Sequence, residues 1–563
     1  MIWLLISVTG ATLGAGWEDD FRFQPPGARP HLEVCYSDAT RETFEIRAAD
    51  YTLLGQLRAP HHLVDRASGQ AWLTLAVTDA DGVHYDTLRT EPASRINLYR
   101  RGPYFCEIHW LDLQVSDAAG RAAPLRGDLA LYCYPDKLLA SITWHATADF
   151  TAREVSYRGL HGERSFTPEP FVAGSHQVFS FPVFQEPPAL PDSAWTTTEA
   201  DQPMRYDAVR GCYTIGSHNP GGFEGHCFDH PNYREQVTFT VRNDDVPRKV
   251  YICHETSSGV RGQVEGGVVL DADGHPLPLT VQVSKNFAGE KEERFYNPED
   301  TPLSENYFPL YLDPGESQTL TSVHLYQNWG NHMTKHFSSL GAWMDYFHSS
   351  TGVTETTCYV PFKFGGLPGV DIADFRAMSQ DTFWNGQPQH DNVAGHSFLS
   401  YHDGAQWQYL TYRGTTYHST GPNWIDIGLE YLSSDGKIRG VVRMWEYPQV
   451  DELRNFIHVR YEALAPLTVT NARENFRLLT VSSHVQGLRY THAAASGLPH
   501  TALDLSRNGF SITGHPLPRQ AGFCAVYGEQ KGSNAVVIRD WQHGVGPAMS
   551  VLTELQERRR GER

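Results

Sequence analysis

Carboxylates, an arginine and two tryptophans recur at alternate positions of the segment 424–446. The dipeptide Asp435-Gly436 in its middle is typical of a tight turn between two antiparallel strands. Pairing the strands about that turn places Asp426 directly opposite Trp445. Because side chains alternate between the two faces of a strand, the polar residues of both strands fall on one face and the apolar residues on the other.

The polar face of this hairpin combines flat aromatic rings with charged groups, which is the chemistry that binds and cleaves sugars. Its members are Trp424, Asp426, Gly428, Glu430, Arg443 and Trp445. Asp426 and Glu430 are four residues apart on one strand, so their Cα atoms lie ~13 Å apart, which is long for a retaining pair of carboxylates. Glu446 or another carboxylate from a neighbouring strand is an equally good partner. An ordinary solvent-facing surface with a cross-strand ion pair is the simpler alternative.

A second polar cluster precedes and overlaps the first, in the segments 383–404 and 413–424. The residues in it that can bind or react are Trp384, Asn385, His390, Asp391, His396, Tyr401, Arg413, Tyr417 and His418. We expect the first segment to be an irregular loop that leads into a hairpin. A histidine with a tyrosine partner can abstract a proton next to a carboxylate, which is lyase chemistry. A carboxylate pair that includes Asp391 is the hydrolytic alternative, and a hydrogen-bonded surface loop is the structural one.

The segment 217–235 is rich in histidines and acidic residues. His226, Asp229 and His230 are weak candidates for metal ligands, because a metal needs three or four converging donors and spacing alone does not show convergence. We expect that no cofactor is required and leave a structural divalent metal open. The chain has no GxSxG, no GxxxxGK[ST] and no convincing GxGxxG after a strand, so a nucleotide cofactor is not expected.

The elements that must position these residues are predicted to be strands. Asp-Gly or Asn-Gly dipeptides stand between β-rich runs at 81–82, 273–274, 403–404, 435–436 and 508–509. We therefore predict an all-β, multidomain chain of β-sandwich or jelly-roll-like modules with one or two short helices. Apolar residues at 3/4 spacing predict those helices at about 331–348 and 371–378.

Composition divides the chain into modules. The segment 184–204 is rich in Pro, Ser and Thr and is predicted to be a boundary. The predicted parts are a signal peptide (1–16), an N-terminal β domain (17–185), a second β-sandwich domain (205–330), a connecting helix (331–350), a third β-sandwich domain that carries the site (355–545) and a charged tail (546–563).

The first sixteen residues, MIWLLISVTGATLGAG, are uncharged and end in small residues, as a cleaved signal peptide does. Eight cysteines fit an oxidising compartment, although their connectivity does not follow from the sequence. We expect a secreted protein, extracellular or periplasmic, with a buried first strand as the alternative. No later apolar run is long enough to span a membrane, and the net charge of −19 argues against nucleic acid as a partner.

Together these features favour a secreted carbohydrate-active enzyme that cleaves a polysaccharide or oligosaccharide. The first hypothesis is a glycoside hydrolase that uses a pair of carboxylates from among Asp391, Asp426, Glu430 and Glu446. The second is a polysaccharide lyase acting on a uronate-containing glycan with a histidine and a tyrosine as base and acid. The third is a non-catalytic glycan-binding or surface structural protein. Substrate identity, oligomeric state and whether the chain is part of a longer protein stay open.

Overall fold

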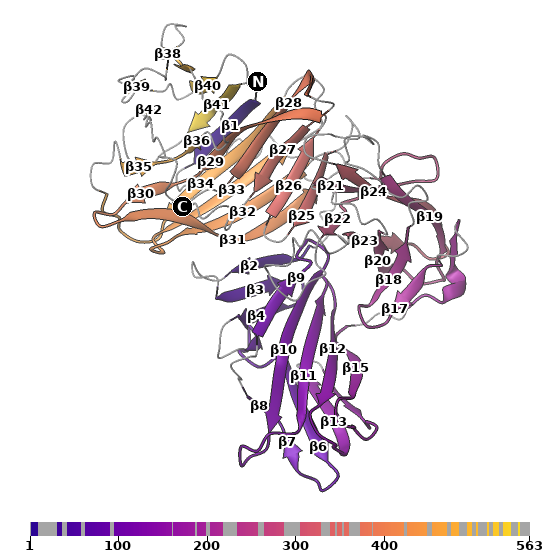
Figure 1. Cartoon of the computed structure of the whole chain (residues 1–563). Coiled ribbons are helices and arrows are strands. Elements are labelled where there is room, and N and C mark those ends of the chain that lie inside the picture. Colours follow the sequence, from indigo (N-terminus) through magenta and orange to yellow (C-terminus); the bar gives the residue numbers. More distant parts are fainter. Residues whose placement is uncertain are drawn as a thin grey trace.

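The computed structural model confirms an all-β, multidomain chain (Figure 1), with no helix of seven or more residues in the part that it describes. The described residues are 2–9, 31–36, 42–57, 62–89, 95–159, 162–185, 189–198, 203–217, 234–256, 264–277, 279–285, 304–327, 338–343, 346–351, 354–359, 372–384, 387–420, 425–446, 453–469, 475–482, 492–497, 503–504, 515–516, 522–527, 533–541 and 550–551. Among them, no helix is long and apolar enough to cross a membrane.

The large sheet is the element that carries the predicted hairpin. Its order is β38 (Leu503–Asp504), β37 (His492–Ala495), β40 (Gly522–Tyr527), β41 (Ser533–Trp541), β1 (Ile2–Thr9), β34 (Leu453–Ala463), β33 (Ile438–Glu446), β32 (Ile425–Ser433), β31 (Trp407–Thr420), β2 (Glu33–Tyr36), β3 (Thr43–Arg47), β4 (Thr52–Gln56) and β5 (Leu63–Asp65), with β30 (Ser400–His402) beside β31 and β35 (Phe476–Arg477) beside β30. Strands from both ends of the chain therefore meet in one sheet.

A second long sheet joins the predicted second and third domains. Its order is β17 (Arg205–Asp207), β18 (Cys212–Gly216), β20 (Arg248–Glu255), β23 (Ser304–Leu312), β22 (Gln282–Lys285), β25 (Ser338–Trp343), β26 (Tyr346–Thr351), β27 (Thr354–Tyr359), β28 (Ile372–Trp384), β29 (Gln387–Ser397) and β36 (Thr480–Ser482). Both sheets cross the predicted boundaries, so strand pairing continues where composition suggests a change of module.

The predicted helices are wrong in the described residues. β25 and β26 form a hairpin within the range predicted to be a connecting helix, and β28 occupies the range of the second one. Pairing of β25 with β22 and of β28 with β29 satisfies the backbone of these segments in the sheet. Sheet pairing thus overrides the pattern of apolar residues three or four positions apart, which is a weak helix signal over so few residues.

The N-terminal part forms two smaller sheets, and a third small sheet packs beside the second long one. The first has the order β15 (His176–Phe184), β12 (Leu138–Ala146), β11 (Leu125–Cys133), β10 (Cys106–Ser116) and β8 (Thr87–Arg89), with β9 (Arg95–Tyr99) also paired to β10. The second has the order β14 (Gly162–Phe166), β13 (Ala152–Gly159), β6 (Leu73–Asp79) and β7 (His84–Tyr85). The third has the order β16 (Trp195–Thr197), β19 (Arg234–Arg242), β24 (Ser317–Gln327) and β21 (Val264–Leu270). A short pair, β39 (His515–Pro516) and β42 (Ser550–Val551), and one 3-10 turn, η1 (Asp192–Ala194), complete the described elements.

Four of the five predicted Asp-Gly or Asn-Gly turns are confirmed. Gly82, Gly274, Gly404 and Gly436 all have a positive φ, between 71° and 105°, which glycine adopts without steric cost. The fifth, at 508–509, lies outside the described residues.

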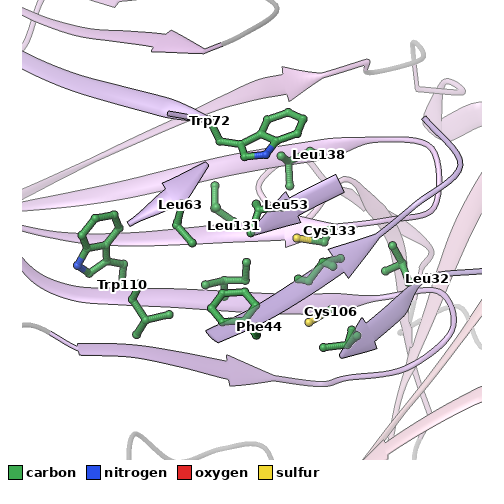
Figure 2. Close-up of a cluster of buried hydrophobic side chains, with 14 of the residues drawn as sticks. Leu32, Phe44, Leu53, Leu63, Trp72, Cys106, Trp110, Leu131, Cys133 and Leu138 are labelled. Atoms are coloured by element: carbon green, nitrogen blue, oxygen red, sulfur yellow. The ribbon is translucent and has the colours of Figure 1, made fainter. Parts of the chain in front are cut away.

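One hydrophobic core connects the N-terminal strands to the large sheet. Figure 2 shows part of it, where Phe44, Leu53 and Leu63 of β3–β5 meet Trp110, Leu131 and Leu138 of β10–β12. The same core continues to Ile427 and Val442 beneath the predicted hairpin. Burial of this apolar surface fixes how β2 and β3 lie against β31, and so fixes which polar residues meet on the other face.

Candidate functional site

The β32–β33 hairpin has the predicted register. Asp426 lies opposite Trp445, Gly428 opposite Arg443 and Glu430 opposite Val441. The predicted core face is also confirmed: Ile425, Ile427, Leu429, Val442 and Met444 are buried. The polar residues therefore share the opposite face, because directly paired residues point to the same side of a sheet.

Asp426 and Arg443 form the central ion pair of this face. The Arg443 Nε and one terminal nitrogen donate to the two Asp426 carboxylate oxygens at 2.9 and 2.8 Å. Asp426 is only 1% exposed, whereas the Arg443 side chain is 27% exposed. The guanidinium lies 5.2 Å from the ring centre of the half-buried Trp445, within cation–π range. Asp426 thus anchors an arginine whose outer edge reaches solvent.

His418 lies on the next strand, in a β-bulge. Tyr417 pairs with Ile427 and Ser419 with Asp426, so His418 is an extra residue in β31. Bulges of this kind redirect a side chain and are enriched beside active sites. Burial is the main cause that holds the pKa of His418 below 6.5, Arg443 adds to it, and the carboxylates of Asp426 and Glu33 act against it. The imidazole is therefore neutral at pH 7.

Gly428 leaves space next to this histidine. A Cβ at position 428 would lie 4.0 Å from the His418 Nε2 and 3.7 Å from the Thr416 Cβ, with no closer atom. A side chain here would occupy that space. The glycine therefore leaves empty a position that a side chain would occupy in van der Waals contact with the His418 Nε2.

His31 brings a second histidine to the same place from far away in the sequence. Its ring is hydrogen-bonded to the backbone of Tyr417 and lies 5.3 Å from the Tyr104 ring. Burial, with smaller effects of His418 and Lys249, lowers the pKa of His31 to about 4. Two neutral imidazoles, His418 on β31 and His31 beside it, thus lie where the N-terminal segment, the large sheet and β20 meet. We refer to His418, Gly428, Asp426, Arg443, Trp445 and His31 as the candidate site.

The other described carboxylates of this face are also paired. Glu33 accepts a hydrogen bond from the Thr416 hydroxyl at 3.2 Å and lies 3.7 Å from Arg47. Glu430 lies between two arginines, Arg413 at 3.4 Å and Arg439 at 3.3 Å. Each of these carboxylates is therefore engaged by charged or hydroxyl partners. Arg413 is itself the extra residue of a second bulge in β31.

The two tyrosines predicted as acids lie in the core. Tyr417 is 5% exposed and packs in the hydrophobic cluster on the side opposite His418. The Tyr401 hydroxyl donates to Asp435 at 2.6 Å inside the hairpin turn. Burial raises the pKa of both. Neither faces the candidate site, because alternation along β31 sends Tyr417 inward and Tyr401 supports the turn at the other end of β32.

The predicted irregular loop is wrong in the described residues up to 397, which are the end of β28 and the whole of β29 in the second long sheet, whereas the hairpin that it was predicted to lead into is present as β30 and β31. Trp384 ends β28, and His390, Asp391 and His396 lie on β29, opposite Met378, Ala377 and Ile372. Glu446 ends β33 opposite Ile425. Their side chains, like the whole of Asn385, Trp424, His226, Asp229 and His230, are outside what the structure describes. Their predicted roles stay predictions.

His31 and His458 are site neighbours that sequence reasoning missed. His458 is 5% exposed and lies directly opposite Arg443 on β34. Period-two alternation in LRNFIHVRYEA would have found it once β34 was paired with β33. His31 carries no such signal, because its place beside His418 depends on packing between segments nearly 390 residues apart.

Two described groups combine enough donors to resemble a cation site. Cys253, Glu255 and Glu305 converge, but Arg210 donates to Glu255 at 2.5 Å and to Glu305 at 3.2 Å and supplies the positive charge. Asp271, Asp273 and His275 converge in an exposed turn whose Asp271 carboxylate already accepts two backbone N–H groups. The first group therefore has its counter-charge from Arg210, and the second is an exposed turn stabilised by backbone hydrogen bonds.

No protein-family model and no curated protein sequence matches the chain. Among solved structures, it is similar to a GH36 alpha-galactosidase, AgaA from Geobacillus stearothermophilus, in complex with raffinose. The identity is 11%, and the match covers 51% of this chain and 40% of that one with a TM-score of 0.13. A TM-score this low is too weak to relate the two folds or their activities.

Proposed function

We propose that the protein is a secreted carbohydrate-active enzyme that cleaves a uronate-containing polysaccharide by β-elimination at the candidate site. The observation that supports this most is the neutral His418 imidazole, whose Nε2 borders the space above Gly428 on the same face as Arg443. A neutral histidine is a general base at physiological pH. The ring of Trp445 offers an apolar surface to the C–H face of a sugar.

In the proposed step, the His418 Nε2 takes the proton on the sugar carbon next to the carboxylate. The electron pair of that C–H bond forms a C=C bond while the glycosidic C–O bond breaks at the neighbouring carbon. The histidinium then gives the proton to the departing oxygen, so no water is consumed. Arg443, held in place by Asp426, faces the substrate carboxylate and stabilises the charge that develops on it.

Glycoside hydrolysis, the first hypothesis from the sequence, has less support among the described residues. It needs one carboxylic acid that donates a proton and one carboxylate that acts as base or nucleophile. Asp426 is enclosed and bound by Arg443, and Glu430 is bound by two arginines. Asp391 and Glu446 stay open as members of such a pair.

Export stays part of the proposal. The structure places Ile2–Thr9 as strand β1, between β34 and β41, and cleavage after residue 16 would remove that strand. N-terminal sequencing of the protein from its native source decides between a cleaved leader and a retained strand.

The test compares three full-length proteins on a panel of acidic and neutral polysaccharides. Elimination creates an unsaturated uronate with a new ultraviolet absorbance. We expect this signal from the wild type on acidic glycans, and a loss of about 10²–10⁴-fold in rate for His418→Gln. His275→Ala, whose side chain is 77% exposed, is the matched control and should keep full activity. Equal rates for His418→Gln and the wild type would overturn the role of His418, and binding without any product would favour the non-catalytic alternative.

A further inference from the structure

Two pairs of cysteines lie on neighbouring strands in the described residues, and they differ in whether the two cysteines are directly opposite each other. Cys106 on β10 is directly opposite Cys133 on β11 in antiparallel register. Directly opposed residues of antiparallel strands have Cα atoms about 4.5–5.5 Å apart, and a disulfide spans Cα separations of about 4.4–6.8 Å. This pair can therefore be bridged without moving the backbone.

Cys212 and Cys253 contact each other but do not fit that range. Their thiols are hydrogen-bonded, yet the parallel register of β18 and β20 pairs Cys253 with Thr214. Cys212 is thus a diagonal neighbour of Cys253, two residues from the paired position. The strand spacing and the rise per residue give a Cα separation of about 8 Å. The second pair serves as an internal control for the first. Cys106 and Cys133 have a Cα separation that a disulfide can span, whereas Cys212 and Cys253 have only a contact between their thiols.

The opposed pair lies at a structurally important place. Cys106 and Cys133 are completely buried, and Figure 2 shows them on neighbouring strands within one cluster of apolar side chains. Their chain neighbours Phe105 and Tyr134 belong to the aromatic cluster between the N-terminal strands and β20–β23, in which Phe105 stacks on Tyr307 at 4.5 Å. A covalent link here would brace the strand ends that hold this interface.

Burial also determines when such a bond can form. It raises the pKa of Cys106 to about 12, so almost no reactive thiolate exists once the core is closed. Oxidation therefore belongs to folding, before the two thiols are covered.

We propose that Cys106 and Cys133 form a structural disulfide when the chain folds in the presence of a disulfide oxidant such as oxidised glutathione. One cysteine thiolate attacks the oxidant and releases its first thiol, and the second cysteine thiolate then displaces the other thiol from the mixed disulfide. The balance is one new S–S bond in the protein, and one oxidant disulfide reduced to two thiols by the two electrons and two protons that the cysteines lose. The six described free cysteines thereby divide into two that are oxidised and four that stay thiols.

The experiment uses the full-length wild-type chain. It is unfolded in urea with reductant, refolded with reduced and oxidised glutathione, alkylated in denaturant and digested without reduction for mass spectrometry. We expect a linked peptide pair containing Cys106 and Cys133, and alkylated Cys212 and Cys253. A parallel refolding with reductant alone should give two more alkylated thiols.

Two outcomes would overturn the proposal. One is full alkylation of Cys106 and Cys133 after refolding with the oxidant, and the other is a link from either residue to another cysteine, such as Cys227 or Cys358. Cys212→Ala should keep the linked peptide, whereas Cys133→Ala should lose it. The decisive comparison needs only the wild type, so a variant that folds poorly does not affect it. Because glycan cleavage is not measured, failure here leaves the proposed function standing.

Discussion

At the scale of single residues, the candidate site depends on how neighbours set the state of Arg443 and His418. Asp426 uses both carboxylate oxygens to hold the guanidinium. That arrangement leaves Asp426 no free oxygen for catalysis but fixes a cation beside Trp445. His418 is kept neutral by burial despite two nearby carboxylates. The sequence placed Asp426, Arg443 and Trp445 on one face, but it did not place His418 there and could not show which carboxylate was already engaged.

Replacing Asp426 with Asn tests the anchoring role. The substitution replaces the buried charged acceptor of the half-buried Arg443 by a neutral amide, so we expect a loss of about 2–3 kcal/mol in the free energy of unfolding. Glu462→Gln is the control, because Glu462 lies 4.0 Å from Arg439 and both are about 40% exposed; its loss should stay below about 0.5 kcal/mol. Urea denaturation measures both, and equal losses would contradict the anchoring role.

Acid stability should reflect the buried histidines. Burial lowers the pKa of His31 to about 4 and that of His254 to about 3, from 6.5. Below pH 6.5 the unfolded chain therefore binds protons that the folded chain does not, so stability is complete above pH 6.5 and decreases as the pH falls toward 4. His254→Asn cannot titrate and should flatten part of the slope in urea midpoint between pH 6.5 and 4. An unchanged slope would show that His254 does not contribute.

At the scale of elements, the sequence predicted what local pattern determines. The Asp435-Gly436 turn and period-two alternation gave the β32–β33 register residue by residue. The bulges that redirect Arg413 and His418 carry no such signature, because a bulge depends on the partner strand. The predicted helices are wrong for a related reason. β25, β26 and β28 are strands of the second long sheet, and pairing with neighbouring strands determines their conformation.

Two glycines of neighbouring strands offer a matched test of the packing around the site. A Cβ at Gly414 would lie 2.5 Å from the Cys35 Cβ and 2.8 Å from the Val34 carbonyl oxygen, whereas one at Gly428 meets nothing closer than 3.7 Å. We expect Gly414→Ala to cost about 1–3 kcal/mol by pushing β2 away from β31. Gly428→Ala should keep the stability within about 0.5 kcal/mol while lowering the cleavage rate about tenfold, because its methyl group fills the space beside His418. Thermal melts and rates check both, and a fully active Gly428→Ala would contradict the position assigned to the substrate.

At the scale of the whole molecule, the N-terminal strands are fixed to the rest through buried polar contacts as well as apolar packing. The Gln282 side chain accepts from the backbone of Tyr104 and Phe105 and donates to the carbonyl of Arg100. Arg100 in turn binds Glu107 of its own module and Glu305 of the other at 2.9 Å. No local pattern predicts such an interface, because its partners are about 180–205 residues apart. The Leu32 N–H donates to the Pro103 carbonyl at 2.7 Å, which ties the segment of His31 to this interface.

Arg100→Met should uncouple the two parts. It leaves two buried carboxylates with one partner fewer each, so we expect a loss of about 3–5 kcal/mol and two separate transitions in calorimetry. Arg121→Met removes an exposed arginine, 73% accessible, from Asp117 and should change stability by less than about 1 kcal/mol. A single transition at the wild-type temperature for Arg100→Met would show that this network does not hold the modules together.

The proposed function depends on cleavage by elimination, and whether oxygen from water enters the products tests this most directly. Wild-type protein is incubated with a uronate-containing polysaccharide in water enriched in heavy oxygen, and the products are weighed by mass spectrometry. Elimination conserves the mass of the substrate, so we predict unsaturated products without solvent oxygen, formed far more slowly by His418→Gln. Saturated products that together gain one heavy oxygen atom per broken glycosidic bond would show hydrolysis and contradict cleavage by elimination.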